Sequence, residues 1–139
     1  MAATLRLEVV TPERLLIREQ VLAVTIPGLG GELGILPEHA ALLSELGDGP
    51  LTFTLETGQK KSLSICGGYL EVLDNRVNVL ATLAEFADEI DVKRAEAALQ
   101  RAENRVLHPT VDLDSARALN AMRRAQARIA ASKLGSAKS

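Results

Sequence analysis

The hydrophobic period of the chain changes once, near Ala84, and no other feature constrains its fold as much. Before this point apolar and polar residues alternate over short runs, as where Leu5, Leu7 and Val9 fall on one side of a strand. After it, apolar residues recur every three to four positions, which is the period of an amphipathic helix. We therefore expect a β-domain at residues 1–84, a linker at 85–90, a helical module at 91–134 and a flexible tail at 135–139.

The first module contains several short, two-faced runs bounded by turn-forming residues. Thr57 with Gly58 and Asp74 with Asn75 predict tight turns, and Gly67 with Gly68 predicts a bulge or a close approach of two backbones. Many short strands separated by such turns indicate a β-sandwich or a flattened barrel. The expected strands cover residues 4–10, 21–27, 51–56, 60–66, 69–73 and 77–82.

The second module predicts two helices joined by a short connection, and hence an antiparallel hairpin. Asp91 can cap the first helix, His108 and Pro109 end it, and Asp114 or Ser115 can cap the second. The expected apolar stripes are Ala95, Ala98, Leu99, Ala102 and Val106 on the first helix, and Leu119, Met122, Ile129 and Ala130 on the second. Because such alanine-rich stripes bury little area, we expect a marginally stable hairpin that can move.

Composition and charge exclude several classes of protein. The single cysteine, Cys66, rules out an internal disulfide framework and fits a reducing compartment. No apolar run approaches the ~20 residues of a membrane span. Residues 1–89 carry a net charge of −7 and residues 90–139 a net charge of +5. The basic half lacks the aromatic side chains that stack on bases, so we expect no nucleic-acid partner.

The glycine-rich stretch GGELGILPEH, at 30–39 after Gly28, does not have the chemistry of a nucleotide loop. A dinucleotide fingerprint would place its third glycine where Leu33 stands. A P-loop would need Lys and Ser or Thr after the last glycine, but Ile35 and Leu36 follow it.

Several motifs, in order along the chain, resemble the ε subunit of F-type ATP synthases. GELGILPEHAALL at 31–43 is similar to the family signature GELGILPGHAPLL, from which Glu38 and Ala41 depart. The resemblance extends through LEVVTPER, SICGGYLEVLDNRVNVLA and IDVKRAEAALQRAENR and covers essentially the whole chain.

This resemblance implies a non-catalytic rotor subunit of a proton-translocating ATP synthase. Its β-domain is expected to pack on the γ subunit and the membrane c-ring, with Glu32 meeting the polar loops of the ring. The hairpin is expected either to fold onto the β-domain or to extend along γ into the catalytic αβ head, where it restrains ATP hydrolysis. The implied location is the cytoplasmic face of the bacterial inner membrane, without insertion. The implied docking residues are Gly31, Glu32, Leu33, Gly34 and His39.

The resemblance also points to regulatory ATP, although no cofactor is required. IDVKRA at 90–95 matches an ATP-binding motif of some bacterial ε subunits, in which Asp91 would accept a hydrogen bond from adenine. Arginines are spaced 7 and 4 apart on both helices, and guanidinium groups suit phosphate oxygens. The candidate residues are Glu85, Ile90, Asp91, Arg94, Ala95, Arg101, Arg117, Arg124 and Arg128. The alternative is a solvated charged face on each helix, with Asp91 as a cap only.

Two rival functions remain open from the sequence. A free-standing nucleotide-sensing module would not tolerate the exposed aliphatic patch that docking on γ requires. An enzyme using His39 and Glu38 would need a concave pocket and a nucleophile, and neither is visible. Two histidines and one cysteine far apart in the chain do not predict a metal site.

Overall fold

A computed structural model describes residues 3–110 and 114–134, so the tail expected at 135–139 lies outside the described residues. Seven strands are followed by a short 3₁₀ helix and two α-helices. Their bounds are β1 Leu5–Val10, β2 Leu15–Gly28, β3 Gly31–Ile35, β4 Leu42–Glu45, β5 Asp48–Leu55, β6 Lys60–Leu73, β7 Arg76–Phe86, η1 Ala87–Glu89, α1 Val92–Leu107 and α2 Ser115–Lys133.

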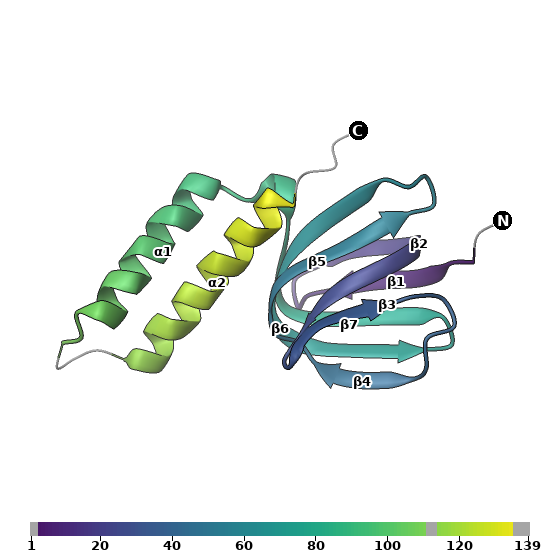
Figure 1. Cartoon of the computed structure of the whole chain (residues 1–139), viewed down its shortest axis with the longest axis horizontal. Coiled ribbons are helices and arrows are strands. Elements are labelled where there is room, and N and C mark those ends of the chain that lie inside the picture. Colours follow the sequence, from purple (N-terminus) through teal and green to yellow (C-terminus); the bar gives the residue numbers. More distant parts are fainter. Residues whose placement is uncertain (1–2, 111–113, 135–139) are drawn as a thin grey trace.

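The strands close into a flattened barrel, in agreement with the sequence prediction. The order along the sheet is β1-β7-β6-β5-β2-β3, with β4 on β6, and β1 also pairs with β2. β1 runs antiparallel to β2 and parallel to β7, so this single strand joins the first and last hairpins. Figure 1 shows the β-domain as one body, with the helical hairpin against one side.

One aliphatic core fills the β-domain. The predicted side of β1 is fully buried, and Phe53 is the largest buried side chain. Leu63 and Ile65 from β6 and Val77 and Val79 from β7 complete the same cluster. The core therefore lies within the β-domain, and the described residues of α1 and α2 contribute nothing to it.

Two glycines in the middle of β6 change which side of the strand faces the core. Ile65 and Leu70 are both fully buried although an odd number of positions separates them. Gly67 and Gly68 lie between them with φ values of 67° and 117°. A Cβ atom on Gly68 would lie 2.0 Å from the carbonyl oxygen of Leu80, which confirms the predicted close approach. β6 is nevertheless one strand, which pairs with β5 before the glycines and with β4 after them.

The helices begin and end where the sequence predicts. Asp91 Oδ1 accepts from the backbone N–H of Arg94, Asp114 Oδ1 accepts from that of Arg117, and His108 is the C-cap of α1. α2 packs on β5 and β6, and α1 packs on the outer side of α2 (Figure 1). Within the described residues, neither helix is long and apolar enough to cross a membrane.

The buried positions of α2 differ from the predicted stripe. Leu119, Met122, Ile129 and Ala130 are only half-buried. The buried residues of α2 are instead Ala118, Ala125, Ala127 and Ala131. The reason is that α2 touches both α1 and the sheet, so the small side chains at its close contacts are the ones removed from water.

Four strand assignments also differ from the sequence prediction. Residues 15–20, which lie outside the expected strands, are the start of β2, paired with β1. The glycine-rich stretch, also outside the expected strands, forms β3 at Gly31–Ile35, antiparallel to β2. β4 at Leu42–Glu45 was likewise not expected. β7 continues through Glu85 and Phe86, the first two residues of the expected linker, because both pair with β6. In each case pairing with a distant strand outweighs a weak local pattern.

Candidate functional site

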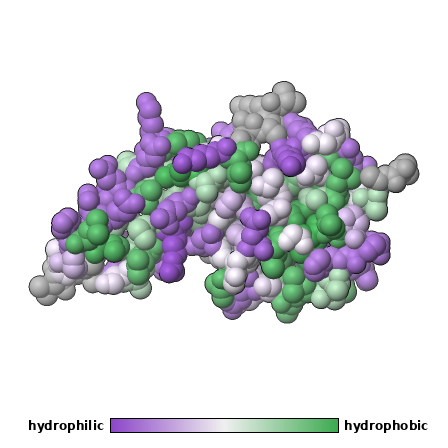
Figure 2. Space-filling model, viewed as in Figure 1, coloured by the Kyte–Doolittle hydropathy of each residue, from purple (hydrophilic) through white to green (hydrophobic). Residues whose placement is uncertain are grey.

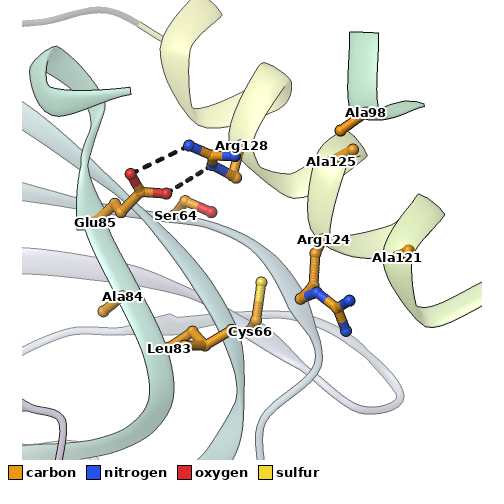
Figure 3. Close-up of a pocket in the computed structure, with 10 residues that line it drawn as sticks. All are labelled: Ser64, Cys66, Leu83, Ala84, Glu85, Ala98, Ala121, Arg124, Ala125 and Arg128. Atoms are coloured by element: carbon orange, nitrogen blue, oxygen red, sulfur yellow. Dashed lines mark hydrogen bonds and ion pairs between the residues drawn. The ribbon is translucent and has the colours of Figure 1, made fainter. Parts of the chain in front are cut away.

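A cleft of about 340 Å³ lies between the hairpin and the outer side of β6 and β7 (Figure 3). Small residues form most of its walls, and Arg124 and Arg128 from α2 and Glu85 from β7 supply its charges. Its lining residues are Ser64, Cys66, Leu83, Ala84, Glu85, Ala98, Ala121, Arg124, Ala125 and Arg128. The cleft therefore exists only while the hairpin is folded onto the β-domain.

Arg128 connects α2 to β7 through a forked ion pair with Glu85. Its Nε donates to Glu85 Oε1 at 2.6 Å, and its Nη2 donates to Oε2 at 3.3 Å. Both side chains are partly buried, with 25% and 35% of their surface exposed. Figure 3 shows the guanidinium of Arg124 extending away from this pair. Arg124 therefore presents a cation on the other side of the cleft, where an anionic group could be held.

The Cys66 thiol lies on the floor of the cleft and is not poised for reaction. Burial, with a smaller contribution from the charge of Asp48, raises the pKa of Cys66 to about 11. The nearby Arg124 charge and a hydrogen bond with Ser64 oppose this increase in the pKa. The thiol consequently stays protonated at neutral pH and acts as a small buried side chain.

The other candidate ATP-binding residues lie outside the set that lines this cleft. Ile90 and Ala95 are buried. Arg94, Arg101 and Arg117 are exposed, and Asp91 uses one carboxylate oxygen to cap α1. The structure thus brings Glu85, Arg124 and Arg128 together and leaves the remaining candidates around the hairpin.

The expected docking residues are divided between the two ends of β3. Gly31 and Glu32 are exposed beside the β2–β3 turn, where Glu32 pairs with Pro27. Leu33 is half-buried and Gly34 exposed. His39 follows the other end of β3, and its Nδ1 lies 2.7 Å from the carbonyl oxygen of Ala40. These residues form a strand and a following turn rather than one loop.

An outer patch of Leu43, Tyr69 and Leu80 lies on the face of β4, β6 and β7 that points away from the core. Tyr69 pairs directly with Leu80 across β6 and β7, and Leu43 lies diagonally from Tyr69 across β4 and β6. The three side chains are 74%, 55% and 55% exposed, respectively. Figure 2 shows hydrophobic residues gathered at the surface of the β-domain. The face reversal at Gly67 and Gly68 is what turns Tyr69 outward while Leu70 enters the core.

Both parts of the chain match one protein family. Residues 4–87 match the β-sandwich domain of the ATP synthase delta/epsilon chain. Residues 88–133 match the long α-helix domain of the same chain. The chain belongs to the ATP synthase delta/epsilon family.

Relatives of this family resemble the chain over nearly its whole length. The ATP synthase epsilon chain of Solibacter usitatus (strain Ellin6076) is 52% identical over 130 residues, which cover 94% of this chain and 96% of that one. The ATP synthase epsilon chain of Syntrophomonas wolfei is 48% identical over 130 residues, covering 94% and 95%.

Solved structures share the fold of this delta/epsilon-family chain. A chain in the Euglena gracilis mitochondrial ATP synthase, determined as OSCP/F1/c-ring, superposes with a TM-score of 0.79 and 26% identity, covering 97% of this chain and 84% of that one. A chain in the central stalk/c-ring of the Tetrahymena thermophila mitochondrial ATP synthase superposes with a TM-score of 0.56 and 18% identity, covering 97% and 98%.

The delta/epsilon-family cleft contains residues that the sequence reasoning missed. Ser64 and Cys66 line it because α2 covers the side of β6 opposite Leu63 and Ile65. The signal was present in SLSIC, where small side chains alternate with large apolar ones. That pattern indicates a strand with both faces covered, the second by a close-packed element.

Proposed function

We propose that this delta/epsilon-family chain is the non-catalytic ε subunit of the rotor in a proton-translocating ATP synthase. The β-domain docks on the γ subunit and the c-ring, so that it transmits rotation between proton flow and the catalytic head. The hairpin regulates ATP hydrolysis. The complex places the chain at the cytoplasmic face of the membrane, held there by its partners.

The outer patch is the observation that supports docking on another chain most directly. Leu43, Tyr69 and Leu80 are neighbours on one face, and apolar side chains grouped at a surface mark interaction sites. A free-standing nucleotide sensor would gain nothing from this patch. The two structural neighbours come from assemblies described as F1/c-ring and central stalk/c-ring, which fits γ and the c-ring as the partners.

Charge reversal at Glu32 tests the contact with the ring. Glu32 is exposed at the start of β3, so Glu32→Lys should leave the fold intact while reversing a charge at the proposed contact. We expect proton pumping per ATP hydrolysed to fall severalfold in reconstituted membranes. Glu56→Lys is the matched control, because Glu56 is also an exposed glutamate, in the β5–β6 turn. Pumping that is unchanged in the Glu32→Lys complex would remove the assigned role of Glu32.

The side of β6 beneath α2 supports a hairpin that can leave the sheet. Ser62, Ser64 and Cys66 face the hairpin, and the α2 residues buried most completely are alanines. Exposing hydroxyl groups and small side chains to water costs little compared with exposing leucines. These small contacts lower the cost of moving from the folded hairpin of this structure to an extended hairpin that reaches the αβ head.

A second function, regulatory ATP binding, is favoured by the cations of the cleft. Arg124 and Arg128 lie on one helix facing the sheet, and the Glu85 carboxylate neutralises Arg128 in the absence of a ligand. A triphosphate would take the place of this carboxylate or use Arg124, and either contact exists only with the hairpin folded. ATP would then stabilise the folded state by about 2.7 kcal/mol at a concentration about 100 times Kd.

Calorimetry on the full chain at millimolar ATP tests this binding. We expect the double variant Arg124→Ala with Arg128→Ala to weaken ATP binding by about tenfold or more, because both guanidinium groups that could contact the phosphates are lost. Arg105→Ala removes an exposed arginine outside the cleft and should leave the affinity unchanged. The absence of any heat of binding from a folded sample would refute the proposal.

The surroundings of His39 and Glu38 do not support the hypothesis of an enzyme that uses these two residues. His39 and Glu38 border a groove of about 330 Å³, but the Glu38 carboxylate is bound to Asn75. The groove's lining residues include no serine, cysteine or lysine that could act as a nucleophile. Within residues 3–110 and 114–134, no group of three or more His, Cys, Asp or Glu residues could hold a metal ion.

A further inference from the structure

Residues 36–39 form a tight turn with a strained third residue. The backbone N–H of His39 donates to the carbonyl of Leu36 at 3.1 Å, Pro37 is the second residue, and Glu38 is the third, with φ of 70°. These are the features of a type II turn, in which the third position strongly favours glycine. A glutamate at this φ strains the backbone, since its Cβ approaches a neighbouring carbonyl.

The side chain of Asn75 holds Glu38 in this conformation. Its Oδ1 accepts from the backbone N–H of Glu38 at 2.7 Å, and its Nδ2 donates to Glu38 Oε1 at 2.8 Å. Together the two residues form a reciprocal pair that joins segments 37 positions apart. We call this pair of residues, Glu38 and Asn75, the turn clamp.

The turn clamp is anchored in the β-domain through its Asn75 end. Asp74 and Asn75 have φ values of 49° and 59°, which are those of the two-residue type I′ turn between β6 and β7. The carbonyl of Asn75 also accepts from the backbone N–H of Arg6, at the start of β1. The turn at 36–39 is therefore tied to a rigid hairpin that is itself tied to a third strand.

We propose that Asn75 is a positioning residue for docking: the turn clamp fixes the turn at 36–39 and so sets how His39 and the exposed Leu36 meet the c-ring. This inference rests on the proposed docking of the β-domain. The physical reason is that glutamate, unlike glycine, does not hold φ of 70° unaided. Glu38 and Asn75 are consequently expected to act as one unit, and a glycine at 38 should make the asparagine dispensable.

Asn75→Gly is the variant that opens the clamp without damaging the β6–β7 turn, because Asp-Gly is itself favoured in a type I′ turn. We expect the amide hydrogen of Glu38 to exchange about tenfold faster in this variant, because its hydrogen bond is lost. Affinity for ATP synthase stripped of this subunit should fall by about threefold to tenfold. Proton pumping per ATP hydrolysed should decrease with it in reconstituted membranes.

Two further variants separate positioning from general stability. The double variant Glu38→Gly with Asn75→Gly should regain the affinity and pumping of the native chain, since glycine adopts the turn without help. Glu38→Gln keeps an acceptor for Asn75 Nδ2 and should behave as the native chain does. The proposal is overturned if Asn75→Gly frees the Glu38 amide but leaves affinity and pumping unchanged, or if Glu38→Gly does not restore them.

The Glu32→Lys complex distinguishes a failure of this inference from a failure of docking. Reduced pumping with Glu32→Lys and normal pumping with Asn75→Gly would overturn the clamp alone. Normal pumping with both variants would overturn docking through residues 31–39, and with it both the assigned role of Glu32 and the positioning role of Asn75.

Discussion

Replacing Gly68 with alanine is expected to abolish stable folding of the β-domain. The new Cβ atom would lie 2.0 Å from the carbonyl oxygen of Leu80, and φ of 117° is a conformation that alanine rarely adopts. The neighbouring atoms are the backbone of β7, which cannot move without breaking its pairing with β6. We expect a loss of more than about 4 kcal/mol in the free energy of unfolding, measured by urea denaturation.

Gly58→Ala provides the matched control for this prediction. Gly58 also has a positive φ, of 89°, but a Cβ atom there would have no neighbour within 4 Å. The Gly58→Ala variant should therefore lose only about 1–2 kcal/mol in the free energy of unfolding, because it adds backbone strain but no clash. If the two variants unfold at the same urea concentration, the close approach at Gly68 does not determine the fold of β6 and β7.

Removal of residues 90–139 is expected to leave a folded β-domain and to raise ATP hydrolysis by the assembled complex. The hydrophobic core lies entirely in the β-domain, and the surface uncovered on β6 consists of Ser62, Ser64 and Cys66. If about half of the complexes hold the hairpin extended, hydrolysis should rise by about twofold. ATP hydrolysis should rise by more than this if most of the complexes hold the hairpin extended.

Hydrolysis and binding must be measured together on the truncated chain. Circular dichroism should show strand content without helix, and the truncated chain should still assemble with the stripped complex. Normal assembly with unchanged or lower hydrolysis would eliminate the inhibitory role of the hairpin in this protein. Failure to assemble would contradict the assignment of docking to the β-domain.

Local patterns in the sequence were sufficient for the elements whose signals are local. The caps at Asp91 and Asp114 and the break at His108 depend on contacts within one turn of chain, so α1 and α2 were predicted closely. The turn at Asp74 and Asn75 follows from the tolerance of these residues for positive φ. Alternation was strong enough to predict β1, β5, β6 and β7, but not the weakly patterned β3 and β4.

Only part of the candidate site could be predicted from the sequence. Resemblance placed Glu85, Arg124 and Arg128 in one set, and the structure brings these three to one cleft. The arginines are equally spaced on the two helices. This spacing could not indicate that Arg94 and Arg101 would be exposed to solvent. Spacing gives the face of a helix, whereas the packing of α2 against β5 and β6 decides which face is covered.

The sequence by itself therefore determined a β-domain followed by a capped helical hairpin, because period and capping act over a few residues. Only the tertiary structure decided the closure of the barrel through β1, the reversal of β6 at Gly68 and the pairing of Glu38 with Asn75. Each of these joins residues distant in the chain, so its energy depends on a partner whose position no local pattern specifies. Glu38 shows this most clearly, since a residue unfavourable for its own turn is held there by a side chain 37 positions away.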